Sequence, residues 1–267
     1  MNVIADTAKV VVDGIGIDVI ERGRGAPLLF LHPDHGIDRT APVLELLAGG
    51  ARLLAPSHPG FGRSEIAKWM NSVDDLAYFY LDFLETLDLR DAILVGVSLG
   101  GWIAAAIAVK STQRLSHLVL ANPLGIKVGD RETRDIADIF ALTDAEYNAL
   151  AYFDPRNGER DYGAMSDPDV MVAARNREAT ARFAWSPYMH DPKLKHRLHR
   201  VRIPTLFLWG ENDRILSEPY GRAYCAAIPG ARFELIARAG HFPHLEQPES
   251  FAARVLAFAG APGGAPA

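Results

Sequence analysis

The longest uncharged stretch of the chain, residues 92–109, places the strongest constraint on its fold. Its length meets the minimum for a membrane span, but glycines and a serine interrupt it in the middle. Small residues of this kind favour a tight turn, with an apolar run before it and an alanine-rich run after it. The stretch is therefore predicted to be a buried strand over Ala92–Val97, a turn, and a buried helix over Leu99–Val109.

Short apolar runs alternate with helix-like segments along most of the chain. The dipeptide Asp13-Gly14 favours a hairpin between the first two runs. Apolar residues at three- and four-residue spacing predict a helix over Val73–Leu87, and Pro248–Phe258 is predicted as a closing helix. The predicted strands are Lys9–Val12, Ile15–Glu21, Pro27–Leu31, Arg52–Ala55, Ala92–Val97, His117–Ala121, Thr205–Trp209 and Arg232–Ala237. This alternation indicates an α/β fold, an eight-stranded and mostly parallel sheet flanked by helices.

The alternation breaks over residues 123–200, where no buried strand is predicted. Polar-rich helical patterns occur there instead, at Thr143–Phe153, Val170–Trp185 and Pro192–Val201. We therefore expect a core domain from residues 1–122 and 201–260, interrupted by a helical cap, or lid, at 123–200. Residues 261–267 contain only Gly, Ala and Pro and are expected to be a disordered tail.

The composition excludes several classes of protein. With 49% hydrophobic residues and a net charge of −5, the chain is too apolar for wholesale disorder and lacks a global basic character. Cys225 is the only cysteine, and the N-terminus has no apolar signal-peptide core. We expect a cytoplasmic protein whose partner is a small-molecule substrate. Neither nucleic acid nor a membrane is an expected partner, and a homodimer stays open.

The segment Gly96-Val97-Ser98-Leu99-Gly100 carries the clearest chemical signal. It matches the nucleophile elbow G-x-S-x-G, placed between a predicted strand and a predicted helix. A sharp turn there pushes the Ser98 hydroxyl out of the sheet, and the N-terminus of the helix favours developing negative charge. The backbone N–H of Leu99 is predicted to face an oxyanion. The alternative interpretation is a glycine-rich turn that only helps a strand and a helix to pack.

A serine nucleophile needs a base and an acid that orients the base. Asp213 and His241 follow the last two predicted strands, in the downstream order that accompanies G-x-S-x-G. The carboxyl ends of strands in α/β sheets are where such sites lie. We therefore predict a catalytic triad of Ser98, Asp213 and His241. Glu211 is the competing acid, and a structural turn or loop role is the alternative for Asp213 and His241.

The chain resembles the α/β-hydrolase-fold superfamily over residues 27–258. Besides the elbow, the resemblance rests on Leu31-His32, Pro59-Gly60-Phe61-Gly62-Arg63-Ser64, Trp209–Asp213, and Gly240-His241 with Glu246-Gln247-Pro248. It implies a serine hydrolase with the triad Ser98, His241 and Asp213 beneath a helical cap. Because the sequence has no dinucleotide or phosphate-loop fingerprint, no cofactor is expected. The pair His196 and His199 has no acidic or cysteine ligand beside it, so no metal site is expected.

One loop departs from the pattern of the superfamily, which commonly has His-Gly followed by small residues. Here the loop is His32-Pro33-Asp34-His35-Gly36. Pro33 has no N–H, so the second oxyanion donor is predicted to be the backbone N–H of Asp34 or, less favourably, of His35. A carboxylate beside an oxyanion is unfavourable, and the Asp34 side chain is expected to turn toward a partner such as Arg63 or His35. The alternative is that Asp34 and His35 only shape the loop.

Histidines and aromatic residues near these motifs are candidates for a substrate pocket: His32, His35, Trp185, Tyr188 and Phe242. For the aromatic residues of the cap, packing on the sheet is the alternative. The expected function is cleavage of a small carboxylic ester, or a related acyl compound, through an acyl-enzyme. A carbon–carbon hydrolase of a diketone-like ring-cleavage product is the second candidate, made less favourable by Val97 and Leu245, where many such hydrolases have a polar residue and a Trp. A non-enzymatic ligand receptor on the same fold is the third.

Overall fold

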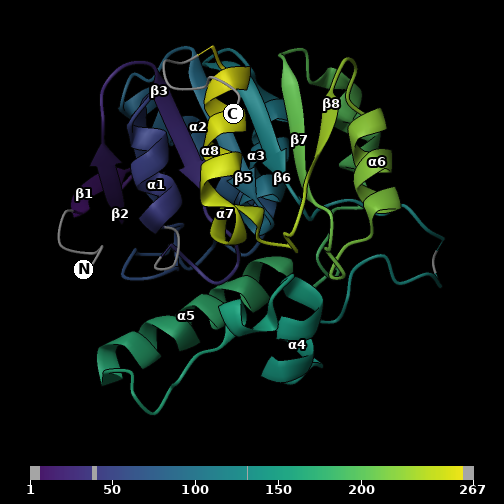
Figure 1. The fold of residues 1–267 in the computed structure, drawn as a ribbon. Helices are drawn as coiled ribbons and strands as arrows, with labels where there is room; N and C mark the ends of the chain where they lie inside the picture. Colours follow the sequence, from purple (N-terminus) through teal and green to yellow (C-terminus); the bar gives the residue numbers. More distant parts are fainter. Residues whose placement is uncertain (1–6, 38–40, 131, 261–267) are drawn as a thin grey trace.

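A single eight-stranded sheet in the order β1-β2-β4-β3-β5-β6-β7-β8 runs through the centre of the protein (Figure 1). This computed structural model describes residues 7–37, 41–130 and 132–260. The strands are β1 Thr7–Val12, β2 Ile15–Arg22, β3 Pro27–Leu31, β4 Arg52–Pro56, β5 Ala92–Val97, β6 Leu115–Ala121, β7 Thr205–Gly210 and β8 Arg232–Ile236. From β4 across to β8 all neighbouring strands pair in parallel, while β1 and β2 form an antiparallel hairpin. All eight predicted strands and the mostly parallel sheet are confirmed.

Helices cover both faces of this sheet. Figure 1 shows α1 (Ala41–Ala48) and α8 (Pro248–Phe258) in front of the sheet, with α2 (Val73–Thr86) and α3 (Leu99–Lys110) behind it. The α2 helix starts at a capping box and buries its apolar stripe. Outside the predicted set, α6 (Glu218–Ala226) packs on β7 and β8, and the short α7 (Pro243–Glu246) precedes α8. The alternating layers place the carboxyl ends of β3 and β5 to β8 along one edge.

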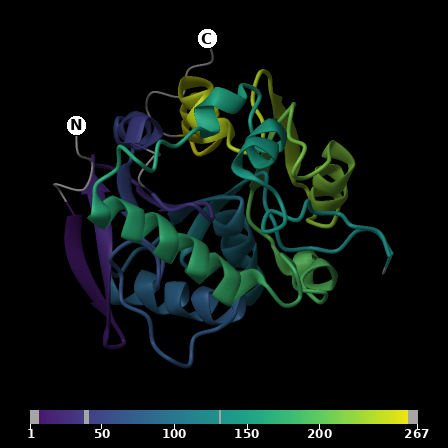
Figure 2. The ribbon, with the colours of Figure 1, turned by 90° about the horizontal axis from the view of Figure 1, so that it is seen from below.

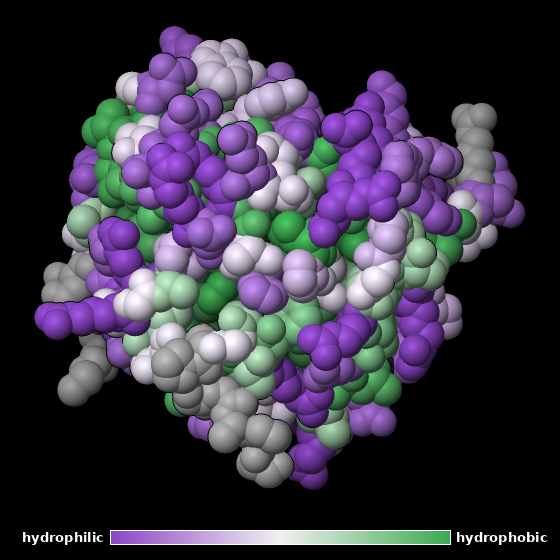
Figure 3. Space-filling view, turned by 90° about the horizontal axis from the view of Figure 1, so that it is seen from above, coloured by the Kyte–Doolittle hydropathy of each residue, from purple (hydrophilic) through white to green (hydrophobic). Residues whose placement is uncertain are grey.

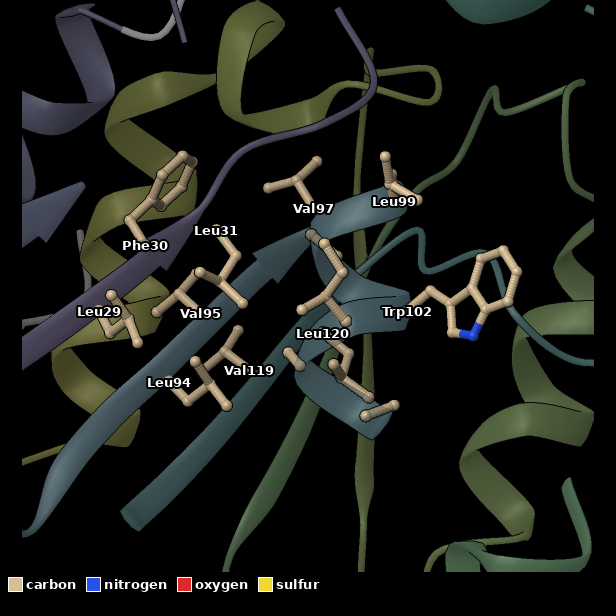
Figure 4. Close-up of a cluster of buried hydrophobic side chains, with 14 of the residues drawn as sticks. Leu29, Phe30, Leu31, Leu94, Val95, Val97, Leu99, Trp102, Val119 and Leu120 are labelled. Carbon is tan, nitrogen blue, oxygen red and sulfur yellow. The ribbon is translucent and has the colours of Figure 1, made fainter. Parts of the chain in front are cut away.

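The stretch that constrained the fold lies in the middle of the core. Every residue of β5 is buried, and almost all of α3 is buried as well. Figure 4 shows how side chains of β3, β5, β6 and the start of α3, among them Leu29, Val95, Val119 and Trp102, gather into one apolar cluster. Within the described residues, no helix combines the length and the hydrophobicity that crossing a membrane requires. The prediction of a buried strand and helix is confirmed.

The helical segment between the neighbouring strands β6 and β7, residues 122–204, is called the insertion below. It contains α4 (Asp144–Ala151), α5 (Asp167–Ala184) and a 3₁₀ turn at Pro155–Gly158. Figures 1 and 2 show α5 running across the carboxyl ends of the strands. No strand of the sheet lies in the part of the insertion that the structure describes.

The end of the insertion differs from its prediction. In place of a helix over Pro192–Val201, the chain forms a 3₁₀ turn at Lys195–Arg200. This turn packs against α3, where Arg200 Nε donates to the carbonyl of Val109 at 3.0 Å, so core contacts rather than an apolar stripe hold it. The division into core and cap domains stays a prediction, and the predicted tail lies outside the described residues. On the face of the protein that lies away from α5, hydrophilic and hydrophobic residues are interspersed (Figure 3).

Candidate active site

Ser98 occupies the turn between β5 and α3. Its backbone has φ of 53° and ψ of −115°, which is a strained conformation for a residue other than glycine. The neighbouring glycines allow this turn to pack tightly. A Cβ at Gly100 would collide with the carbonyl of Leu31 on β3, and one at Gly96 would collide with the carbonyl of Gly100. The small residues of the motif are therefore needed for the close approach of β3, β5 and α3.

Hydrogen bonds connect Ser98, His241 and Asp213 in one chain. Nε2 of His241 lies 2.8 Å from Ser98 Oγ, and its Nδ1 lies 2.8 Å from Asp213 Oδ2. All three residues are buried. Because the carboxylate of Asp213 can only accept, the shared proton belongs to Nδ1, which leaves Nε2 free to accept the proton of the serine hydroxyl. The structure thus brings the three predicted residues together in the geometry of a nucleophile, a base and an orienting acid.

Asn122, at the carboxyl end of β6, was not a predicted site residue. Its Nδ2 donates to Asp213 Oδ2 at 2.6 Å, and its Oδ1 accepts from the backbone N–H of Gly210 at 3.1 Å. The other carboxylate oxygen of Asp213 accepts the N–H groups of Ile215 and Leu216 at 2.9 and 3.0 Å. These donors fix the carboxylate that orients His241. The only sequence signal was a polar residue directly after a buried strand.

The loop that carries His241 is tied to the insertion. The backbone N–H of His241 donates to the carbonyl of Ala151, the last residue of α4, at 2.7 Å. Glu246 accepts the N–H of Gly240 at 2.7 Å and also the N–H groups of Phe153 and Asp154 at 3.0 and 3.1 Å. This carboxylate, part of the Glu246-Gln247-Pro248 motif, therefore joins the histidine loop to the segment that follows α4.

The predicted oxyanion donors lie on two elements. Leu99 begins α3, so its N–H has no acceptor within the helix. The Asp34 carboxylate lies 3.8 Å from His35 Nδ1, whereas Arg63 is exposed, which makes His35 the partner of the two that were considered. Burial would raise the pKa of Asp34, but the polar contact and charge of His35, with the charge of His241, hold the pKa below its usual value. Asp34 is thus an anion at neutral pH.

His32 is the first residue of the loop of residues 32–36 and does not line the cavity beside Ser98. Its ring stacks on that of His58 with centroids 3.7 Å apart, and its Nε2 accepts the backbone N–H of His58 at 3.0 Å. His58 Nδ1 is 2.5 Å from the Tyr80 hydroxyl. Burial lowers the pKa of His58 to about 4 and that of His32 well below its usual value. Two neutral imidazoles therefore support the loop from below.

Two neighbouring cavities lie between the sheet and the insertion. The smaller one is lined by Ser98, His241, Asp34, Leu124, Ile139, Tyr147, Met189 and Ile215. The larger one shares Asp34, Ile139 and Tyr147 with it and also includes His35. Ile139, Tyr147 and Met189 were not predicted to line a pocket. Their contribution depends on how the insertion folds over the sheet, which no local pattern encodes.

Three other candidates for the pocket line neither of these two cavities. Trp185 is 57% exposed, and with Tyr188 it lines a separate groove beside residues 126–138. The Tyr188 hydroxyl bonds to the backbone of Ile139 and Ala137. Phe242 is fully buried behind the cavities, edge-on to the rings of His35 and His241. Among the described residues, no group of three or more His, Cys, Asp or Glu side chains could hold a metal ion.

Known proteins with this fold catalyse different reactions. A curated relative from Paraburkholderia phymatum, a 2-hydroxy-6-oxononadienedioate/2-hydroxy-6-oxononatrienedioate hydrolase, is 28% identical over 79% of this chain and 77% of its own. Two solved structures are similar in fold, each with a TM-score of 0.73. An esterase from Thermogutta terrifontis is 24% identical, over 95% of this chain and 98% of its own. A bromoperoxidase from Bacillus anthracis is 22% identical, over 94% and 100%.

The individual relatives differ in activity, but a sequence profile of one protein family matches most of this chain. The profile of the alpha/beta hydrolase family matches residues 28–254, which extend from β3 into α8 and include the whole insertion. Several of the curated relatives are hydrolases, which supports a hydrolase here. The sheet order, the strained serine turn and the profile agree, and the chain belongs to the alpha/beta hydrolase family.

Proposed function

We propose that this protein is a serine hydrolase that cleaves a small carboxylic ester, or a related acyl compound, through an acyl-enzyme. The observation that carries the proposal is the chain of 2.8 Å contacts from Ser98 through His241 to Asp213, in which Ser98 and His241 line a cavity. A serine becomes a competent nucleophile when a neighbouring base accepts its proton and an acid holds the base in place.

The reaction follows from the positions of these groups. Ser98 Oγ attacks the ester carbonyl while His241 Nε2 takes the hydroxyl proton, and Asp213 stabilises the resulting imidazolium. The N–H of Leu99, with the backbone N–H of Asp34, receives the oxyanion. His241 then returns the proton to the leaving alkoxide. Water, deprotonated by His241, attacks the acyl-enzyme and releases the acid together with free Ser98.

The dimensions of the cavity support a short acyl group. The cavity beside Ser98 is narrow and walled by apolar side chains such as Leu124 and Met189, so it has room for a small group only. The larger cavity beyond Asp34, Ile139 and Tyr147 offers room for the rest of the substrate.

Carbon–carbon bond hydrolysis is the second candidate, and two observations favour it. The curated relative from Paraburkholderia phymatum is named for that class of ring-cleavage substrate. The larger cavity includes Arg160 and Arg177, which suit an extended, negatively charged substrate. The same three residues would serve both reactions, so only a comparison of substrates separates them.

Replacement of the nucleophile tests the proposal. With phenyl esters from acetate to octanoate, we expect turnover that is highest for short acyl chains. Ser98→Ala should lower kcat by about 10⁴-fold or more and abolish labelling by a fluorophosphonate probe. Ser111→Ala, at the other end of α3, is the matched control and should retain both properties.

The outcomes separate the candidate functions. Full ester turnover by Ser98→Ala would contradict the covalent route. A kcat/KM for 2-hydroxymuconate semialdehyde far above that for every ester would establish the carbon–carbon reaction instead. Stoichiometric labelling of Ser98 with no multiple turnover of either substrate class would favour a ligand receptor.

A further inference from the structure

One oxygen of the Asp34 carboxylate has no hydrogen-bond partner. Oδ1 is completely buried and unpaired among the residues that the structure describes, although the side chain as a whole is 13% exposed. His35 Nδ1 lies 3.8 Å from this oxygen, beyond hydrogen-bond range. Buried polar atoms are almost always paired, and a buried charged one without a donor is costly. The orphaned oxygen therefore calls for a ligand.

Asp34 lies where that ligand has to be the substrate. It lines the small cavity together with Ser98 and His241, and it also lines the larger cavity. Its carboxylate is close enough to His241 for the two to interact electrostatically. A molecule whose carbonyl reaches Ser98 passes directly beside Asp34.

The backbone around Asp34 is held in place. Thr180 Oγ1 donates to the carbonyl of Asp34 at 2.9 Å, and Asn176 Nδ2 donates to the carbonyl of His35 at 3.0 Å. Both donors are buried side chains of α5 in the insertion. The backbone of the loop is thus fixed before substrate enters, which sets the point from which the Asp34 side chain extends. Such preorganisation is what a selective contact requires.

We propose that Asp34 determines specificity by accepting a hydrogen bond from a hydroxyl or ammonium group on the acyl part of the substrate, next to the scissile carbonyl. This inference rests on the proposed hydrolase function. A negative charge in the wall of the cavity also disfavours a carboxylate at the same place on the substrate, because like charges repel at short range in a buried site. The preferred substrates are therefore esters of hydroxy or amino acids rather than esters of simple alkanoic acids.

The side chain can be tested apart from the backbone, since every substitution keeps the backbone N–H that is proposed to receive the oxyanion. The probes are phenyl lactate, with a hydroxyl beside the carbonyl, phenyl propionate, with none, and monophenyl malonate, with a carboxylate. For the unmodified protein we expect kcat/KM for lactate to exceed that for propionate by about tenfold or more, the size of a hydrogen bond to a charged group. Malonate should be the poorest substrate.

Two substitutions and one control complete the experiment. Asp34→Ala should bring the lactate-to-propionate ratio close to one and should raise turnover of monophenyl malonate. Asp34→Asn, which keeps the shape but not the charge, should give an intermediate ratio. Asp138→Asn removes a carboxylate from the separate groove near Trp185 and should leave the ratio unchanged. Thermal unfolding of each variant checks that it is folded.

Failure of this inference differs from failure of the proposed function. If ester turnover depends on Ser98 but the lactate-to-propionate ratio stays the same in Asp34→Ala, the Asp34 assignment is overturned and the hydrolase stands. If no ester is turned over, the proposed function fails. Titration of lactamide and propionamide into the unmodified protein and into Asp34→Ala then decides, because equal affinity for the two amides in the unmodified protein also overturns the assignment.

Discussion

The triad and the loop of residues 32–36 lie at the same edge of the sheet but are supported in different ways. The Asp213 carboxylate is fixed by Asn122 and by backbone N–H groups, all from segments directly following β6 and β7. The carbonyls of the loop are instead held by side chains of α5, and the carboxylate of Asp34 has an oxygen without a partner in the described structure. The contrast indicates that the segments directly after β6 and β7 fix the carboxylate of the triad, whereas α5 holds the loop that meets the substrate.

The largest expected effect concerns the loop of residues 32–36: the free energy of unfolding should fall at acid pH because buried His58 beneath the loop resists protonation. Burial lowers the pKa of His58 from 6.5 to about 4, so between these values the unfolded chain binds a proton that the folded chain does not. The stability contributed by neutral His58 is complete above pH 6.5 and is lost as the pH falls toward 4. At about 1.4 kcal/mol per pH unit the loss reaches about 3 kcal/mol at pH 4, measured by urea unfolding.

The substitution His58→Gln separates the contribution of His58 to acid sensitivity from that of other titratable groups. The variant should lose the part of the slope between pH 6.5 and 4 that one proton contributes. His199→Gln removes an exposed histidine of the insertion and should keep the slope of the unmodified protein. An identical slope in His58→Gln would mean that His58 is not the group that resists protonation.

A smaller effect is expected when the support of the triad is removed. Asn122→Ala leaves the buried N–H of Gly210 without its acceptor and removes one of the two donors to Asp213 Oδ2, so that only His241 Nδ1 stays. We expect a loss of about 1–3 kcal/mol in the free energy of unfolding, the range for unsatisfied buried polar groups. Because the change acts on the orientation of His241, kcat should fall while KM stays the same.

The matched control for this substitution is Asn71→Ala, an exposed asparagine before α2. It should alter neither kcat nor the urea midpoint. A rise in KM with unchanged kcat in Asn122→Ala would instead mean that Asn122 contributes to substrate binding rather than to the orientation of His241.

The smallest effect is expected when the hydrogen bond that holds the loop of residues 32–36 to α5 is removed. Thr180→Val removes the hydrogen bond to the Asp34 carbonyl at nearly constant volume, with an expected loss of about 1 kcal/mol in stability. Since the loop faces the substrate, KM should rise while fluorophosphonate labelling of Ser98 proceeds at its normal rate. Thr205→Val, which loses a hydrogen bond to Ile203 at the start of β7, should leave KM unchanged. Slower labelling in Thr180→Val would show that α5 also controls the nucleophile.

The sequence predicted those parts of the site whose placement follows from local patterns. Hydrophobic runs located the strands, and the requirement for small residues located the turn at Ser98. Asp213 and His241 could be assigned because both follow strands of a parallel sheet, whose carboxyl ends meet at one edge. The short helices α1 and α6 were missed, since eight or nine residues give a weak periodic signal beside a large sheet.

Local patterns did not predict which residues of the insertion line the cavity. Trp185 and Tyr147 are both aromatic residues within it, yet Tyr147 lines the cavity at Ser98 while Trp185 faces solvent. Which of the two turns inward depends on how α4 and α5 lie across the strand ends, through contacts such as that between His241 and Ala151. These contacts join positions about 90 residues apart in sequence, and no periodicity within either segment encodes them.

The sequence by itself determined the parallel sheet, the serine turn and the order of the three residues connected by hydrogen bonds. Each of these depends on hydrophobic periodicity, on glycine at points of close backbone approach, or on strand order, which are local properties of the chain. Only the tertiary structure decided that Asn122 orients Asp213, that His35 rather than Arg63 accompanies Asp34, and which side chains enclose the cavity. The physical reason is that burial and the pairing of buried charges depend on segments distant in sequence, and these meet only when the insertion packs onto the sheet.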